Sequence, residues 1–83
     1  MYMSKIILRA KERGYTIKEK EGLHVRSKIK NIYASKEGLA FTFLFVDNDL
    51  KNISYYKNWD KLINAGKCIE YGVDKSRVLE LLK

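Results

Sequence analysis

One row of side chains in this sequence is spaced to bind phosphate groups. His24, Arg26, Lys28 and Lys30 occupy every second position of a stretch that alternates as a β-strand does. An extended chain advances about 3.3 Å per residue, so this row repeats every ~6.6 Å, close to the distance between phosphates along a nucleic-acid strand. The row contains no acidic residue. This pattern predicts a cationic sheet face that contacts a polyanion.

A second, shorter row precedes the first. Lys18 and Lys20 also alternate, and Glu21-Gly22 predicts a turn that folds the two rows into a hairpin with the cations on one face. Tyr33 follows the longer row and is placed to stack on a base. The candidate nucleic-acid-binding residues are therefore Lys18, Lys20, His24, Arg26, Lys28, Lys30 and Tyr33.

The charge balance of the chain favours the same kind of partner. Seventeen Lys and Arg against ten Asp and Glu give a formal net charge of +7. The excess is concentrated in residues 1–38, with ten basic and four acidic residues, whereas residues 39–83 hold seven and six. Such asymmetry is typical of a basic surface that faces a nucleic acid or an acidic protein surface. Five or six phosphate contacts would give a log–log salt slope of about −5 on duplex DNA, and a homodimer would double the contact area.

The cationic row also fits two roles that involve no nucleic acid. One face of a two-layer sheet is polar in any case, so the cations could simply keep that face in water. They could also dock on an acidic protein surface. His24 would add to the charge only below about pH 6.5.

Enzymatic chemistry has little support in the sequence. His24 and Cys68 are the only residues of their types, which leaves a structural zinc site without ligands. Asp47 and Asp49 follow a predicted strand and could hold a divalent ion, but a turn rich in Asp and Asn explains them without a third carboxylate. Glycine-rich phosphate-binding motifs are absent from the sequence. We expect no enzyme activity, no metal and no cofactor.

Length and composition predict one folded domain over residues 1–83. Hydrophobic residues make up 46% of the chain and charged residues 33%, which is typical of a folded domain. No apolar stretch approaches the roughly 20 residues needed to cross a bilayer, and no secretory signal pattern opens the sequence. A single cysteine excludes an internal disulfide. We therefore expect a cytoplasmic protein that does not bind membranes.

Hydrophobic spacing and the glycines predict the elements that position these residues. Helices are predicted over residues 5–13, 54–65 and 75–82. Strands are predicted over residues 15–20, 23–33 and 39–46, and the last strand is central because it is apolar on both faces. Ser4 and Asp74 are the expected helix N-caps, and Gly14 the expected end of the first helix. Residues 67–73 fit either a short strand or an irregular link.

These elements together predict an α+β fold with the order α-β-β-β-α-α. The predicted architecture is a two-layer sandwich, in which a three-stranded antiparallel meander carries the helices on one face. Phe41, Phe43 and Phe45 alternate on the central strand and are assigned to the core. Trp59 lies on the apolar stripe of the second predicted helix and is also assigned to the core.

One stretch of the sequence and the predicted order of its elements can be compared with known families. The opening helix and the ten residues RGYTIKEKEG (13–22) resemble the start of some small phage anti-CRISPR proteins. The predicted α-β-β-β-α order is similar to that of double-stranded-RNA-binding domains, but residues 60–63 lack the GxxKKxAK-like start of their last helix. The sequence therefore predicts a small basic nucleic-acid-binding protein without catalytic activity. The alternative is a small phage or mobile-element protein that binds and inhibits a host protein.

Overall fold

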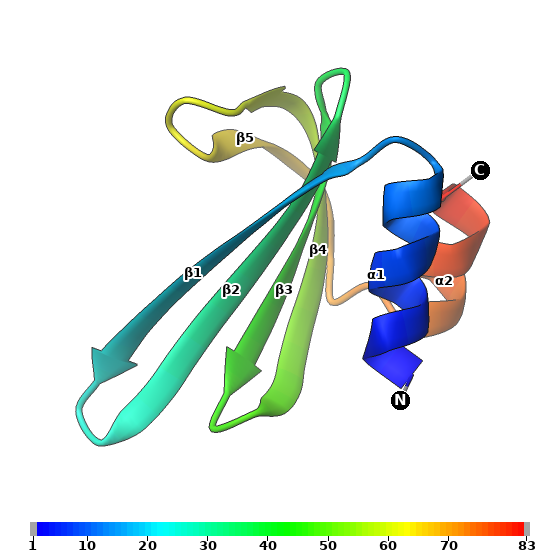
Figure 1. The fold of residues 1–83 in the computed structure, drawn as a ribbon. Coiled ribbons are helices and arrows are strands. Elements are labelled where there is room, and N and C mark those ends of the chain that lie inside the picture. Colours follow the sequence, from blue (N-terminus) through cyan, green and yellow to red (C-terminus); the bar gives the residue numbers. More distant parts are fainter. Residues whose placement is uncertain (1, 83) are drawn as a thin grey trace.

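A computed structural model describes the backbone of residues 2–82 and the side chains of residues 5–82. The elements are α1 (Tyr2–Glu12), β1 (Thr16–His24), β2 (Ser27–Lys36), β3 (Leu39–Val46), β4 (Asp49–Asp60), β5 (Ala65–Tyr71) and α2 (Lys75–Leu81). The five strands form one antiparallel sheet in the order β1-β2-β3-β4-β5, so each strand pairs with its neighbours in sequence. Figure 1 shows both helices side by side against one side of this sheet.

The hydrophobic core lies between the two helices and the sheet. Successive residues of a strand point to opposite faces, so Phe41 and Phe43 of β3 point toward the helices together. The most deeply buried members of this core are Ile6, Ala10, Ile32, Ala34, Phe41, Phe43, Ile53, Val78 and Leu82. We call the side of the sheet under the helices the covered face and the opposite side the open face.

Local capping explains where α2 begins and where α1 stops. The carboxylate of Asp74 accepts a hydrogen bond from the backbone N–H of Arg77 at 3.0 Å, which confirms the predicted N-cap. Gly14 adopts a φ of 87° just after α1, a conformation that glycine reaches without steric cost. Ser4 lies inside α1, because the helix already begins at Tyr2, so its predicted capping role is wrong.

The predicted order α-β-β-β-α-α is wrong, because residues 54–65 do not form a helix. These residues belong to β4, to the turn after it and to the first position of β5, and the observed order is α-β-β-β-β-β-α. The supposed helical stripe is divided, with Trp59 buried in the sheet and Leu62 and Ile63 exposed in the turn. Residues 53–59 combine Ile, Trp and two Tyr with Ser and Asn. Ile, Trp and Tyr favour strands, and Ser and Asn are weak helix formers, so these preferences together outweigh the accidental helical spacing.

The predicted turn at Glu21-Gly22 is also wrong. β1 continues through Gly22, and the chain reverses in the two-residue turn after His24. The observed register places Ile17 of β1 opposite Ala34 of β2, so that β1 contributes an apolar side chain beside the core. Burial of one face fixes strand register strongly, and here it outweighs the tendency of glycine to form turns.

Other predicted elements agree with the structure. The central strand over residues 39–46 is confirmed by β3, which is third of the five strands. The last helix is confirmed by α2, whose Val78 is fully buried. Residues 67–73, which fit two alternatives, form most of β5 and the link to α2. No helix within residues 2–82 is long and apolar enough to cross a membrane.

Candidate functional site

The strand register divides the predicted cations between the two faces of the sheet. Residues paired directly across antiparallel strands point to the same side. Lys18 pairs with Tyr33 and Lys20 pairs with Asn31, and this set of residues lies on the open face. His24 pairs with Ser27 and belongs to the same face, at the far end of β1. Four of the seven candidate residues therefore share the open face, and Lys18, Lys20 and Tyr33 are neighbours on it.

The other three candidates lie elsewhere, so the prediction of one cationic face is wrong. Lys28 and Lys30 lie on the same face of β2 as its core residues, and Lys30 pairs directly with Glu21. The Nζ atom of Lys30 also lies 3.4 Å from Oε1 of Glu19, which offsets its charge. Arg26 is exposed in the β1–β2 turn, outside both strands.

The two aspartates considered as a metal site form a hairpin turn instead. Asp47 and Asn48 have φ values of 50° and 70°, the backbone pattern of a type I′ turn. Oδ1 of Asp47 accepts a hydrogen bond from the backbone N–H of Lys28 at 2.9 Å. Among the residues whose side chains are described, no three His, Cys, Asp or Glu gather where they could hold a metal ion.

The open face contains a pocket of about 290 Å³, which we call the open-face pocket. The ring centroids of Tyr33 and Trp59 lie 5.7 Å apart, and those of Tyr56 and Trp59 lie 5.2 Å apart. Thr42 of β3 pairs directly with Tyr33, and its small side chain leaves room in the middle of the sheet. The pocket is lined by Asn31, Tyr33, Thr42, Tyr56, Trp59, Asn64, Ala65 and Gly66.

Irregular backbone in β4 and β5 turns Trp59 into this pocket. Asn58 has a φ of 55°, and the pairing of β4 with β5 shifts between Lys57 and Asp60. Extra residues in a bulge redirect the side chains that follow them. A Cβ atom at Gly66 would lie 2.9 Å from the carbonyl oxygen of Lys57 and 3.0 Å from Cα of Trp59. Glycine therefore allows the two backbones to approach closely beneath the pocket.

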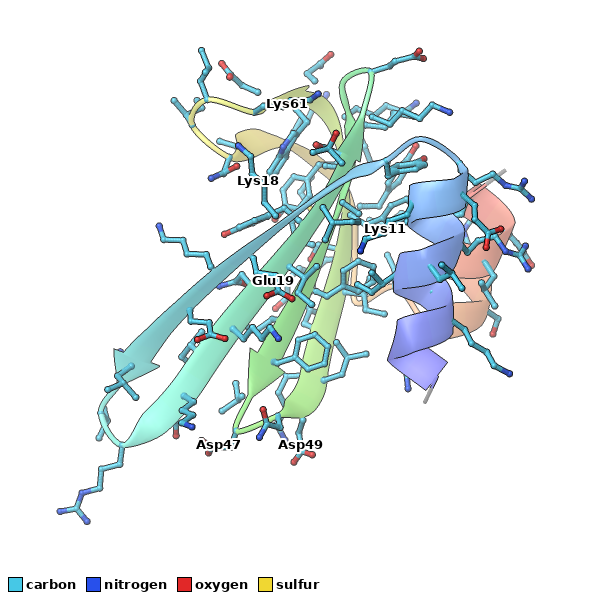
Figure 2. All side chains as sticks on the ribbon, viewed as in Figure 1. Lys11, Lys18, Glu19, Asp47, Asp49 and Lys61 are labelled. Carbon is cyan, nitrogen blue, oxygen red and sulfur yellow. The ribbon has the colours of Figure 1, made fainter. Side chains whose placement is uncertain are left out.

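A side-chain contact ties the β4–β5 turn to the edge of the sheet. The Nζ atom of Lys18 donates to the carbonyl oxygen of Lys61 at 3.1 Å, and Figure 2 shows both lysines on the side of β1 away from the helices. Within the turn, the backbone N–H of Leu62 donates to Oδ1 of Asp60 at 2.9 Å. Lys18 also pairs with Tyr33, which lines the open-face pocket, and Lys20 lies two residues farther along the same face of β1.

Sequence reasoning missed part of this site. It did not single out Tyr56 or Asn64, and it assigned Trp59 to the core of a helix. One signal bears on Tyr56 alone, because residues 52–55 alternate polar and apolar types as a half-buried strand does, which favours a strand at this point over a helix. In β4, Ile53 faces the covered side and its neighbours Asn52 and Ser54 face the open side, although Ser54 is buried as deeply as Ile53.

The groups with shifted pKa values lie at α2 and in the core. A hydrogen bond from Arg77 to Oε1 of Glu70, 2.9 Å long, lowers the pKa of that carboxyl group. The backbone hydrogen bond from Arg77 lowers the pKa of Asp74 in the same way. Burial raises the pKa of Tyr15, and the nearby Tyr55 raises it further. These interactions stabilise the fold and leave the chemistry of the open face to aromatic rings, amides and lysines.

Comparison of the chain with protein-family models, with curated proteins and with solved structures found no match.

Proposed function

We propose that the protein is a small, basic, cytoplasmic protein that binds single-stranded nucleic acid on its open face and catalyses no reaction. The observation that carries this proposal is the placement of three aromatic rings around a pocket, beside two lysines of the edge strand. Tyr33, Tyr56 and Trp59 supply the rings, and Lys18 and Lys20 supply the charge.

The aromatic rings support a single strand rather than a duplex as the ligand. Bases within a duplex are stacked on one another, so their faces are closed to a protein ring. An unpaired base can stack on Tyr or Trp, and such stacking tolerates many sequences because every base has an aromatic face. Tyr33 and Trp59 already touch each other, so a base would stack on their outer side and not between them.

The lysines are placed to reach the backbone of a strand whose base occupies the pocket. Lys18 is paired directly with Tyr33, and residues paired in this way have Cβ atoms about 4.5–5.5 Å apart. Neither Lys18 nor Lys20 forms an ion pair with an acidic residue of the described chain. Three phosphate contacts, counting Lys61, would give a salt slope of about −2 on a single strand, shallower than the full cationic row would give.

A second candidate function rests on exposed apolar side chains. Leu62 and Ile63 are 92% and 69% exposed at the tip of the β4–β5 turn. Large apolar side chains gathered at a surface are typical of protein-binding sites. This supports the alternative of a phage or mobile-element protein that inhibits a host protein, with the turn as its contact point.

Titration of labelled oligonucleotides tests the first proposal. Fluorescence anisotropy at about 50 and 200 mM salt should show binding to single-stranded DNA or RNA that weakens with salt, and weaker binding to duplex. Tyr33→Ala should weaken single-strand binding about tenfold, because one stacking contact is lost. Tyr71→Ala is the matched control, since Tyr71 is an 80% exposed tyrosine that pairs with Ser54 on the same face but lies outside the pocket lining.

The outcomes of this titration distinguish binding at the open-face pocket from binding elsewhere and from no nucleic-acid binding. Loss of binding in Tyr33→Ala with normal binding in Tyr71→Ala supports the open-face pocket as the site. Equal effects of the two substitutions would contradict it. A folded wild-type protein that binds no oligonucleotide at low salt would exclude nucleic-acid binding and favour the protein-binding function.

A further inference from the structure

We infer that the open-face pocket takes one unstacked base and selects bases that carry an exocyclic amino group, through the amide of Asn64. This inference deepens the proposed function and rests on it, since it assumes that a single strand occupies the open face. It assigns base selection to a residue in the β4–β5 turn, away from the cationic row.

The first observation is an unpaired polar atom at Asn64. The Oδ1 atom of this residue is buried, and it accepts no hydrogen bond from any residue of the described chain. Buried side-chain oxygens in folded proteins nearly always have a partner, so an exception requires a physical reason. Asn64 also lines the open-face pocket, so its side chain lies next to a space that a ligand can enter.

The backbone conformation alone does not explain an asparagine at this position. Asn64 has a φ of 50°, and asparagine is one of the few residues that adopt such values readily. Glycine adopts them with less strain and would leave no unpaired acceptor. The buried, unpaired amide oxygen of Asn64 therefore carries a desolvation cost that a glycine would not have, and a role in binding accounts for its presence.

The size and walls of the pocket fit one base. Its volume of about 290 Å³ lies just below the range of about 300–1,000 Å³ typical of drug-sized ligand sites. Tyr33 and Trp59, whose ring planes are tilted by 34° to each other, provide an aromatic wall, and Asn31 provides a second amide from β2. A flat ring with polar edges matches this combination of an aromatic wall and amides.

Hydrogen-bond polarity decides which bases would fit best. Adenine and cytosine present exocyclic amino groups, which donate, whereas thymine presents carbonyl oxygens at its exocyclic positions. An unpaired amide oxygen needs a donor, so the first two bases satisfy it and thymine does so only through its ring N–H. The Oδ1 atom has almost no exposed surface before binding. The amide group therefore has to rotate about χ2 to present this oxygen to the base. Such a rotation has a low cost, because χ2 of asparagine has no sharp staggered minima.

Homopolymers bound to paired variants of Asn64 test the inference. Oligo(dA), oligo(dC) and oligo(dT) of about 12 nucleotides are titrated into the protein, with anisotropy for affinity and the fluorescence of Trp59 for occupation of the pocket. Trp59 is the only tryptophan of the chain, so its quenching reports the pocket directly. Asn64→Gly removes the amide but permits the positive φ, and Asn64→Asp keeps an acceptor.

The wild-type protein should bind oligo(dA) and oligo(dC) about threefold to tenfold more tightly than oligo(dT), the effect of one hydrogen bond. Asn64→Gly should reduce this ratio to near one, and Asn64→Asp should retain it while all three affinities fall through charge repulsion. The inference would be overturned if wild type and Asn64→Gly had the same preference ratio, or if the wild type bound all three homopolymers equally well. Either result would leave the proposed function standing. Absence of binding to all three homopolymers would overturn both.

Discussion

The two faces of the sheet each carry a cluster of three aromatic rings with similar spacing. On the covered face, centroid distances of 6.1 and 4.9 Å join the covered triplet, Tyr15, Phe41 and Tyr55. On the open face, distances of 5.7 and 5.2 Å join the open triplet, Tyr33, Trp59 and Tyr56. The triplets differ in what lies over them, because α1 and α2 close the first and neither helix covers the second (Figure 1).

This difference shows that the partners of an aromatic ring, and not its type, decide its role. The covered triplet is surrounded by aliphatic side chains of the helices, among them Ile6 and Val78, so it has no room for a ligand. The open triplet is surrounded by Thr42, Asn31 and Asn64, which leave space and add hydrogen-bonding groups. The first arrangement contributes to the free energy of folding, and the second offers a surface for binding.

The largest expected difference between the triplets is in stability. Phe41 is fully buried, so Phe41→Ala should lower the free energy of unfolding by about 3–5 kcal/mol through lost burial and a cavity. Tyr33 is only half-buried, so Tyr33→Ala should cost far less, about 1 kcal/mol. Urea denaturation followed by circular dichroism gives both values. Equal losses would mean that the open triplet is a second core, and the binding proposal would lose its main support.

How much of this arrangement the sequence could predict depends on the element. The central strand was predictable because residues 39–46 are apolar on both faces, and α2 because Asp74 marks its start. The open triplet was not predictable from spacing, since Tyr55, Trp59 and two later apolar residues mimic a helical stripe. Only the pairing of β4 with β3 and β5 separates the strand from the helix, and such pairing depends on residues distant in sequence.

The placement of the cations could have been derived more fully from the chain. A two-residue turn pairs even-numbered residues of one strand with odd-numbered residues of the next, as His24 with Ser27 here. Even-numbered lysines on both strands of such a hairpin must therefore point to opposite faces. This rule alone places Lys18 and Lys28 on opposite faces of the hairpin, wherever along the chain the two-residue turn lies. The identity of the helix-covered face, in contrast, follows only from the packed structure.

The second expected difference concerns these two pairs of lysines. The double substitution Lys18→Gln with Lys20→Gln should make the salt slope of single-strand binding shallower by about 1 to 1.5, because two phosphate contacts are lost. The matched variant Lys28→Gln with Lys30→Gln removes the same charge from the covered face and should leave the slope nearly unchanged. Anisotropy titrations at several salt concentrations measure both slopes. A larger effect from the second pair would place the binding surface on the covered face.

The smallest expected difference is a pH dependence confined to the covered triplet. Burial, with a further contribution from Tyr55, raises the pKa of Tyr15 above its ordinary value of 10.0. The unfolded chain therefore loses the Tyr15 proton at lower pH than the folded chain does, so folding stability contributed by this group is complete below pH 10 and decreases as the pH rises above that value.

Tyr15→Phe removes this titration but keeps the ring that contacts Phe41. The midpoint of urea denaturation should thus fall more steeply above about pH 10 in the wild-type protein than in Tyr15→Phe. Lys36, whose Nζ lies 5.8 Å from the centre of the Tyr15 ring, is present in both proteins, so the difference between the two curves isolates the phenol. Parallel curves would mean that water reaches Tyr15 as it reaches the open face. The two triplets would then differ in their neighbours but not in their exclusion of solvent, and covering by the helices could not be the reason for their separate roles.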